Sequence, residues 1–172
     1  MSFDDASTAR FVLFAPPLNE TDEASRLIAE AVETASIAAV IFIPSDDPDP
    51  RAVLKLLKPA IAAAQAGGAA ALLAGAGDLV GRAGADGIHV SGEAVAAEAE
   101  RFHPDKIVGA GNLKTRDDAM TVGGTADYVM FGEPDAQGRL PSFAAVVERV
   151  QWWAEVFEPP CIGFAPDLDG VA

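Results

Sequence analysis

A short segment that occurs twice is the feature that most constrains the fold of this chain. Residues 84–90 read Gly-Ala-Asp-Gly-Ile-His-Val, and residues 125–132 read Thr-Ala-Asp-Tyr-Val-Met-Phe-Gly. Each copy has a small residue, then Ala-Asp, then a short apolar run, and each follows a stretch with a helical pattern. Such runs are typical of strands that enter a buried parallel sheet. The repeat therefore predicts a fold built from alternating strands and helices.

The same alternation extends along the rest of the chain. Pro59 lies within the helix expected at residues 50–66 and predicts a kink or a division there. Strands are expected at residues 10–16, 37–44, 69–74, 86–90, 106–110, 127–131 and 160–164. Helices are expected at residues 22–35, 50–66, 78–83, 93–102, 116–122 and 142–157. This order gives parallel strands with right-handed helical crossovers, as in a doubly wound sheet or a (βα)8 barrel.

Seven strand–helix units in series favour the (βα)8 barrel over the doubly wound sheet, and residues 1–172 are expected to form one domain. A complete barrel of this kind has about 250 residues. Because this chain has 172 residues and ends just after the seventh expected strand, we expect the eighth unit to be missing from it.

The charge and cysteine content exclude several classes of function. With 26 acidic and 12 basic residues, the chain has a formal net charge of −14 and lacks the basic surface that nucleic-acid binding needs. No apolar run reaches the roughly 18 residues of a membrane span. Cys161 is the single cysteine, and the acidic N-terminus is unlike a signal peptide. We therefore expect a cytoplasmic protein without nucleic-acid or membrane partners.

Three segments resemble the thiamine phosphate synthase/TenI superfamily. GADGIHVSGE at 84–93, PDKIVGAG at 104–111 and TADYVMFGEP at 125–134 are similar to the family patterns GADGVHLGQED, IIGVS and GADYVGFGP. The resemblance covers about residues 11–171 and implies a (βα)8 barrel. For family synthases it implies the joining of hydroxymethylpyrimidine diphosphate to thiazole phosphate, with Mg²⁺ and loss of pyrophosphate. TenI-type members instead isomerise the thiazole phosphate.

The chain departs from the family pattern at most of the positions that carry this chemistry. The family's first magnesium aspartate matches the segment 74–76, which reads Ala-Gly-Ala, and its second falls on Ala94. The loop with the family's Thr-Lys diphosphate clamp is shortened to residues 133–139. Three hypotheses stay open: a thiamine phosphate synthase-like transferase, a non-catalytic member that binds a phosphorylated metabolite or a protein partner, and a different small-molecule enzyme on the same barrel.

The candidate site residues lie on loops after the expected strands, because barrel chemistry is found at that end. The residues expected to contact a phosphorylated small molecule are Ser45, Asn112, Lys114 and Arg139. The acids expected to hold Mg²⁺, which the family resemblance alone implies, are Glu93, Glu133 and Asp167. The alternative for Ser45 and Asn112 is that each caps the next helix. The alternative for Lys114, Arg139 and the three acids is that they are solvated surface side chains.

Two further features carry open alternatives. His89 is expected to be a packed, hydrogen-bonded strand residue, and a catalytic role would require it to face the mouth of the barrel. Trp152 and Trp153 cannot both face inward, because consecutive helical residues point about 100° apart. One of them is therefore a candidate for a subunit interface in a homo-oligomer.

Overall fold

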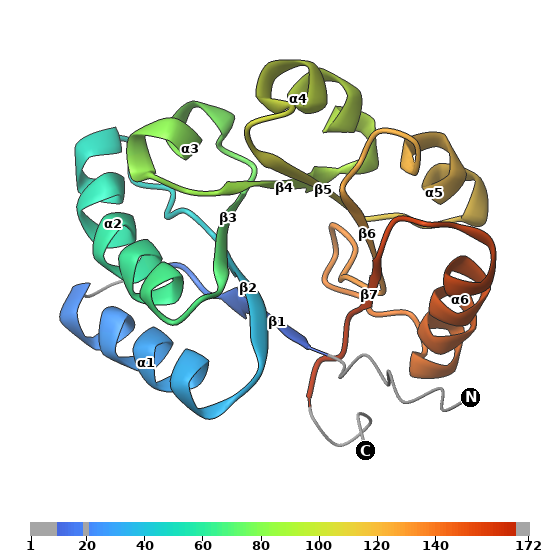
Figure 1. The fold of residues 1–172 in the computed structure, drawn as a ribbon, viewed down its shortest axis with the longest axis horizontal. Coiled ribbons are helices and arrows are strands. Elements are labelled where there is room, and N and C mark those ends of the chain that lie inside the picture. Colours follow the sequence, from blue (N-terminus) through green and yellow to red (C-terminus); the bar gives the residue numbers. More distant parts are fainter. Residues whose placement is uncertain (1–9, 19–20, 168–172) are drawn as a thin grey trace, which may run out of the picture.

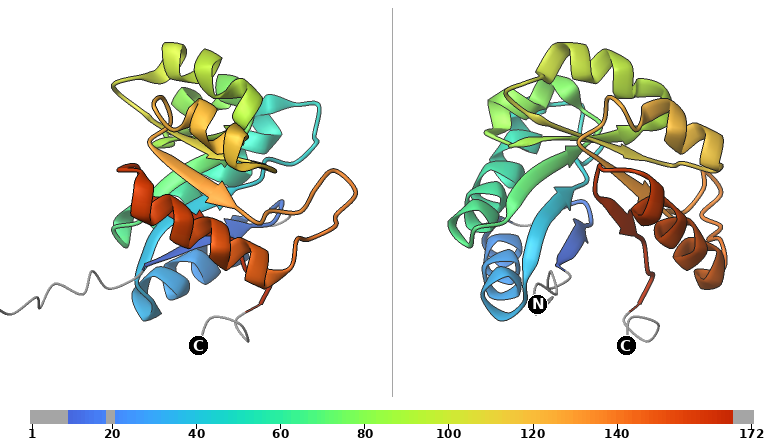
Figure 2. Two further views of the ribbon diagram at one scale, coloured as in Figure 1. Left: turned by 90° about the vertical axis from the view of Figure 1, so that its right-hand side faces the viewer. Right: turned by 45° about the vertical axis from the view of Figure 1, so that its right-hand side comes forward.

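Seven parallel strands form one curved sheet in the order β1 to β7, and the helices cover its outer face (Figures 1 and 2). The structure is a computed structural model that describes residues 10–18 and 21–167. The strands are β1 (Phe11–Ala15), β2 (Ile37–Phe42), β3 (Ala70–Ala74), β4 (Gly87–Ser91), β5 (Ile107–Gly111), β6 (Tyr128–Phe131) and β7 (Cys161–Gly163). The helices are α1 (Thr21–Thr34), α2 (Pro50–Ala66), α3 (Gly77–Ala83), α4 (Val95–Phe102), α5 (Arg116–Val122) and α6 (Phe143–Val156), with a 3₁₀ turn η1 (Gly92–Ala94) before α4.

The strand order confirms the predicted barrel. Each strand pairs in parallel with the next one along the chain, whereas a doubly wound sheet reverses its strand order at one point. The sheet curves until its two ends come close, and the Phe14 ring of β1 meets the Phe164 ring after β7 edge to face at 5.8 Å. Residues 10–18 and 21–167 contain no eighth strand. None of the described helices is long and apolar enough to cross a bilayer.

Side chains alternate between the two faces of each strand, and this alternation builds two apolar layers. On β2, Val40 and Phe42 point outward and pack under the helices, while Ala39 and Ile41 point into the barrel. The buried residues of the inner layer are Ile41, Leu72, Tyr128 and Met130. Six partly buried residues pack against them, namely Val12, Phe14, Ala39, Ala74, Ile107 and Ile162. The inner layer is the smaller of the two, and the His89 ring of β4 packs beside it against Phe14 and Tyr128.

Helix α2 runs unbroken from Pro50 to Ala66, so Pro59 does not divide it, and the kink that the sequence predicts as the alternative stays a prediction. Pro59 removes one backbone N–H donor from the helix, but it lies on the exposed face. The opposite face buries Leu57, Ala60 and Ile61 in the outer core, among other residues. This burial holds the two halves of the helix in one piece.

The two tryptophans of α6 face different environments, as the helical spacing predicts. Trp153 is 0% exposed and donates its indole N–H to the Pro159 carbonyl at 2.7 Å. Trp152 is half-buried, and the Arg116 guanidinium lies 4.8 Å from its ring centroid. The chain itself therefore covers part of Trp152, and a role for this residue in a subunit interface stays a prediction.

The aspartates of the repeated segment tie neighbouring strands together at the end of the barrel where the strands begin. Asp86 Oδ2 accepts the backbone N–H of Ala71 at 2.8 Å, which links the loop before β4 to β3. Asp127 Oδ2 accepts the N–H of Val108 at 2.7 Å, which links the loop before β6 to β5. His103, which follows α4, also contacts Asp127 Oδ2 at 2.9 Å. The aspartates of the repeat therefore stabilise the pairing of neighbouring strands.

Replacing Asp86 with alanine is expected to lower the free energy of unfolding by about 1–3 kcal/mol, because the Ala71 N–H loses its partner at a half-buried position. Urea denaturation followed by circular dichroism measures this. Asp105→Ala, at an exposed position near the same end of the barrel, serves as the control and should change stability by less than about 0.5 kcal/mol. Equal effects of the two substitutions would contradict the proposed strand tie.

Candidate functional site

Two adjoining clefts lie at the end of the barrel where β4, β5 and β6 terminate. The first cleft, of about 430 Å³, lies beside the loop between β6 and α6, and the second, of about 570 Å³, lies beside η1 and α5. In Figure 2 the loop between β6 and α6, drawn in orange, projects beyond the strand ends. The residues that line both clefts are Asn112, Leu113, Lys114, Asp135 and Ala136. The two clefts therefore form one continuous candidate site.

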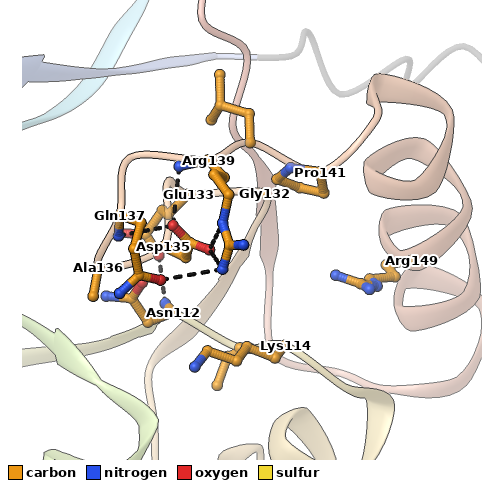
Figure 3. A pocket seen from close by; sticks show the side chains of 12 residues that line it. Asn112, Lys114, Gly132, Glu133, Asp135, Ala136, Gln137, Arg139, Pro141 and Arg149 are labelled. Atoms are coloured by element: carbon orange, nitrogen blue, oxygen red, sulfur yellow. Dashed lines mark hydrogen bonds and ion pairs between the residues drawn. The ribbon is translucent and has the colours of Figure 1, made fainter.

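Three basic residues line the first cleft, although the chain as a whole is strongly acidic. Arg139 is already engaged, since its Nε and Nη2 each lie 2.8 Å from Asp135 Oδ2 (Figure 3). Hydrogen bonds from the Arg139 backbone and side chain lower the pKa of Asp135 below its usual range. Arg139 therefore lies at the site, as predicted, but its positive charge is balanced by a neighbour on its own loop.

Lys114 and Arg149 are the other two cations of the first cleft. Within the described residues, neither makes an ion pair with a carboxylate. Arg149 extends from α6 toward the loop after β6, and Lys114 lies at the lower edge of the same cleft (Figure 3). Arg149 is not among the residues that the sequence predicts for the site, because it lies on a helix and not on a loop after a strand. It follows buried Val146 by three positions, and this helical spacing could have placed it on the inner face of α6.

The loop that carries Lys114 is fixed by a capping box at the start of α5. Asp118 Oδ2 accepts the backbone N–H groups of Thr115 at 2.8 Å and Lys114 at 3.0 Å, and Thr115 Oγ1 accepts the N–H of Asp118 at 3.0 Å. The hydrogen bonds with Thr115 lower the pKa of Asp118 below its ordinary value. An ionised Asp118 therefore holds the backbone of Lys114 at the cleft.

A buried polar chain connects the barrel interior with the first cleft. His89, on β4, lies with Nδ1 2.7 Å from the Tyr128 hydroxyl and with Nε2 2.9 Å from Glu133 Oε1. Glu133 Oε2 accepts the backbone N–H of Asn112 at 2.6 Å. The His89 and Glu133 side chains are only 5% and 9% exposed. His89 is therefore the packed, hydrogen-bonded residue that the sequence predicts, and its partner lines the mouth of the barrel.

The environment of Tyr128 keeps its hydroxyl protonated. Burial raises the pKa of Tyr128 well above its usual range, and the charge of Glu133 raises it further. Tyr128 is therefore a neutral phenol, and its hydroxyl lies next to His89 Nδ1. When Nε2 of His89 carries a proton, this N–H donates to the Glu133 carboxylate.

Two glycines of β5 provide the space for these side chains. A Cβ at Gly109 would collide with the Tyr128 ring, and a Cβ at Gly111 would collide with both His89 Nε2 and Glu133 Oε2. The next residue, Asn112, has a φ of 54°, a left-handed conformation that asparagine tolerates better than most residues. The backbone of β5 therefore makes room for the polar chain and supplies its last hydrogen bond.

The three acids predicted to hold Mg²⁺ do not converge. Glu133 lines the first cleft with both oxygens engaged, Glu93 lines the second, and Asp167 follows β7 and lines neither. No group of three or more His, Cys, Asp or Glu side chains suited to a metal ion occurs in residues 10–18 and 21–167. The described residues therefore offer no preformed protein cage for Mg²⁺, which prefers an octahedral set of oxygen ligands.

The structure separates the predicted phosphate-contacting residues. Asn112, Lys114 and Arg139 meet at the first cleft. Ser45 lies elsewhere, in a third cleft of about 680 Å³ between the ends of β2 and β3 and helices α3 and α4. Its hydroxyl is buried without a hydrogen-bond partner in the described part of the chain. Ser45 therefore does not share a site with the other three residues.

The comparisons with known proteins agree with this architecture. Residues 12–165 match the family model described as thiamine monophosphate synthase. The chain belongs to this family. A thiamine-phosphate synthase from Rhodospirillum centenum is 34% identical over 157 residues, which cover 89% of this chain and 75% of the relative. The structure of a thiamine phosphate pyrophosphorylase from Pyrococcus furiosus has the same fold, with a TM-score of 0.70 at 18% identity over 90% of this chain and 75% of that one.

Replacing Asp118 with asparagine is expected to destabilise the protein at neutral pH and to lose this effect in acid. Folding lowers the pKa of Asp118, so its contribution is present above the unfolded-state pKa and disappears as the pH falls through the folded-state pKa. Urea unfolding at pH 7 and at a series of values below about pH 4 measures the difference from the wild type.

Asp117→Asn, in the same helical turn, is the control for the general effect of an acid near a helix N-terminus. A stability difference between Asp118→Asn and the wild type that stays constant from neutral to acidic pH would contradict the capping role of the carboxylate.

Proposed function

We propose that this chain binds a phosphorylated small molecule related to the precursors of thiamine, at the first cleft and without a resident magnesium ion. The observation that carries the proposal is the convergence of Lys114 and Arg149 on one cleft of a chain with net charge −14. Neither cation makes an ion pair in the described residues, although the charge of Lys114 acts on Asp118 and Asp135. Asn112 and Gln137 line the same cleft and can contribute hydrogen bonds. Family membership supports the link to thiamine biosynthesis. We propose the cytoplasm as the compartment of the protein.

The charge of the cleft favours a monophosphate over a diphosphate. A phosphate monoester carries about −1.5 to −2 charges at pH 7, which Lys114 and Arg149 attract although the Glu133 carboxylate lines the same cleft. A diphosphate carries more, and its departure in a transfer reaction requires further neutralisation by metal ions or cations. Arg139 is balanced by Asp135, and the acids do not gather into a metal site. The thiazole phosphate is therefore the better match among the two family substrates.

The second candidate is the synthase reaction itself, in which the chain joins the pyrimidine diphosphate to the thiazole phosphate. It is supported by the 34% identity with a thiamine-phosphate synthase and by Glu93 on the adjoining second cleft. This candidate requires magnesium for binding or turnover, whereas the first does not. A non-catalytic role with a protein partner predicts binding of neither compound.

Isothermal titration calorimetry with thiazole phosphate and with the pyrimidine diphosphate, each with and without Mg²⁺, tests the proposal. We expect thiazole phosphate to bind equally well in both conditions. Lys114→Ala and Arg149→Ala should each weaken binding by about tenfold or more, because each removes a charged hydrogen bond worth about 1.5–3 kcal/mol.

Arg116→Ala is the matched control, because Arg116 pairs with Glu148 on the outside of the barrel and lines neither cleft. Binding that survives both cleft substitutions contradicts the proposed site. Magnesium-dependent binding of the diphosphate, together with growth rescue of a strain that lacks its thiamine phosphate synthase, would establish the second candidate instead.

A further inference from the structure

We propose that Asp135 is the specificity-determining residue of the first cleft, because its carboxylate occupies, from within the chain, the place on Arg139 that a second phosphate group would take. The proposal rests on the function proposed above and deepens it, since it assigns the choice between a monophosphate and a diphosphate to one side chain. The contacts that carry it lie in the short loop between β6 and α6, at residues 135–139.

The two carboxylate oxygens of Asp135 have different hydrogen-bond partners. Oδ1 accepts the backbone N–H groups of Gln137 and Arg139, both at 2.9 Å. Oδ2 lies 2.8 Å from both Nε and Nη2 of Arg139. Closing the loop therefore requires only Oδ1, and an asparagine could supply an equivalent oxygen. Within residues 10–18 and 21–167, Oδ2 forms hydrogen bonds with the Arg139 guanidinium alone.

The loop itself holds Arg139 in this position. The backbone N–H of Asp135 donates to the Arg139 carbonyl at 3.0 Å, and the N–H of Gly138 donates to the Asp135 carbonyl at 2.8 Å. Arg139 Nη2 also donates to Gln137 Oε1 at 3.1 Å, so the guanidinium folds back onto its own loop (Figure 3). A ligand in the cleft therefore meets an arginine whose Nε–Nη2 edge, which is suited to a bidentate contact with a phosphate group, is already engaged.

The Asp135 carboxylate and a ligand phosphate compete for the same donors. Arginine binds carboxylates and phosphates through the same N–H groups of its guanidinium. Because Asp135 lies on the same closed loop, its contact with Arg139 is intramolecular, whereas a bound ligand loses translational and rotational freedom. Asp135 therefore withholds Arg139 from a phosphate group that would reach it from the cleft.

The charge of Asp135 also acts on the rest of the site. Hydrogen bonds from the backbone and side chain of Arg139 lower the pKa of Asp135, and the charge of Lys114 lowers it as well, so the carboxylate is ionised at neutral pH. Asp135 lines both adjoining clefts, where its negative charge repels an anion. A diphosphate carries more negative charge than a monophosphate, and it is therefore repelled more strongly.

Isothermal titration calorimetry of the full chain with inorganic phosphate and with inorganic pyrophosphate, both without Mg²⁺, tests the proposal. Asp135→Asn keeps the oxygen that closes the loop and replaces Oδ2 with an amide NH₂ group, which cannot accept from Arg139. The variant should bind pyrophosphate about tenfold more tightly than the wild type, because it gains a charged contact and loses a repulsion. Its affinity for phosphate should rise by less than about threefold, because only the repulsion is lost.

Two further variants separate the freed arginine from a change in net charge. Asp105→Asn removes the same charge at an exposed position near the opposite end of the barrel, and it should leave the affinity for both anions unchanged. The double variant Asp135→Asn/Arg139→Ala lacks the guanidinium, so its affinity for pyrophosphate should return to within about threefold of the wild-type value. Misfolding cannot produce the gain expected of Asp135→Asn, because it would weaken the binding of both anions.

The outcomes separate this proposal from the one on which it rests. Equal gains of Asp135→Asn for the two anions, or no gain for pyrophosphate, overturn the role of Asp135 and leave the binding proposal intact. A gain for pyrophosphate that persists in the double variant also overturns it, because Arg139 would then not be the group that Asp135 withholds. A wild type and an Asp135→Asn variant that bind neither anion nor thiazole phosphate at millimolar concentration overturn both proposals.

Discussion

The space inside the barrel beside β5 is the constraint on which the candidate site depends. Gly109 and Gly111 carry no side chains, and the volumes that they leave are filled by Tyr128, His89 and Glu133 from neighbouring strands. Because protein interiors are close-packed, a methyl group at either glycine would displace a side chain of the polar chain. Without this space the Glu133 carboxylate could not lie between His89 Nε2 and the Asn112 N–H at the mouth of the barrel.

The residues at the two ends of the strands have different roles. Where the strands begin, Asp86 and Asp127 of the repeated segment hold backbone N–H groups of the preceding strands. Where the strands end, the same segments lead to Glu93 and Glu133 at the two clefts. The aspartates that hold the strands together thus lie at the opposite end of the strands from the carboxylates at the clefts. This division agrees with the general pattern of barrels, in which stability is built at one end and function at the other.

Membership of the thiamine monophosphate synthase family and the departures from its pattern fit one physical account. Where the family pattern has magnesium aspartates, this chain has the segment 74–76, which reads Ala-Gly-Ala, and Ala94. Where it has a cationic clamp for a diphosphate, this chain has a short loop with an Arg139–Asp135 ion pair. The first cleft thus has the cations Lys114 and Arg149 and the hydrogen-bonded carboxylate of Glu133. The chain thus keeps the fold of its family and offers different groups at its mouth.

The sequence by itself determined the strand–helix alternation, the barrel and the loops that reach its mouth, because these follow from local periodicity and from short motifs. It placed Asn112, Lys114 and Arg139 at the site, but it could not show that Asp135 balances Arg139 or that Pro59 leaves α2 whole. Only the tertiary structure brought Glu133 to His89, 44 residues earlier, and Arg149 from a helix to the cleft. The physical reason is that side-chain partners across a barrel depend on the curvature of the strands and on the volume that glycines leave. Neither of these can be read from a local sequence pattern.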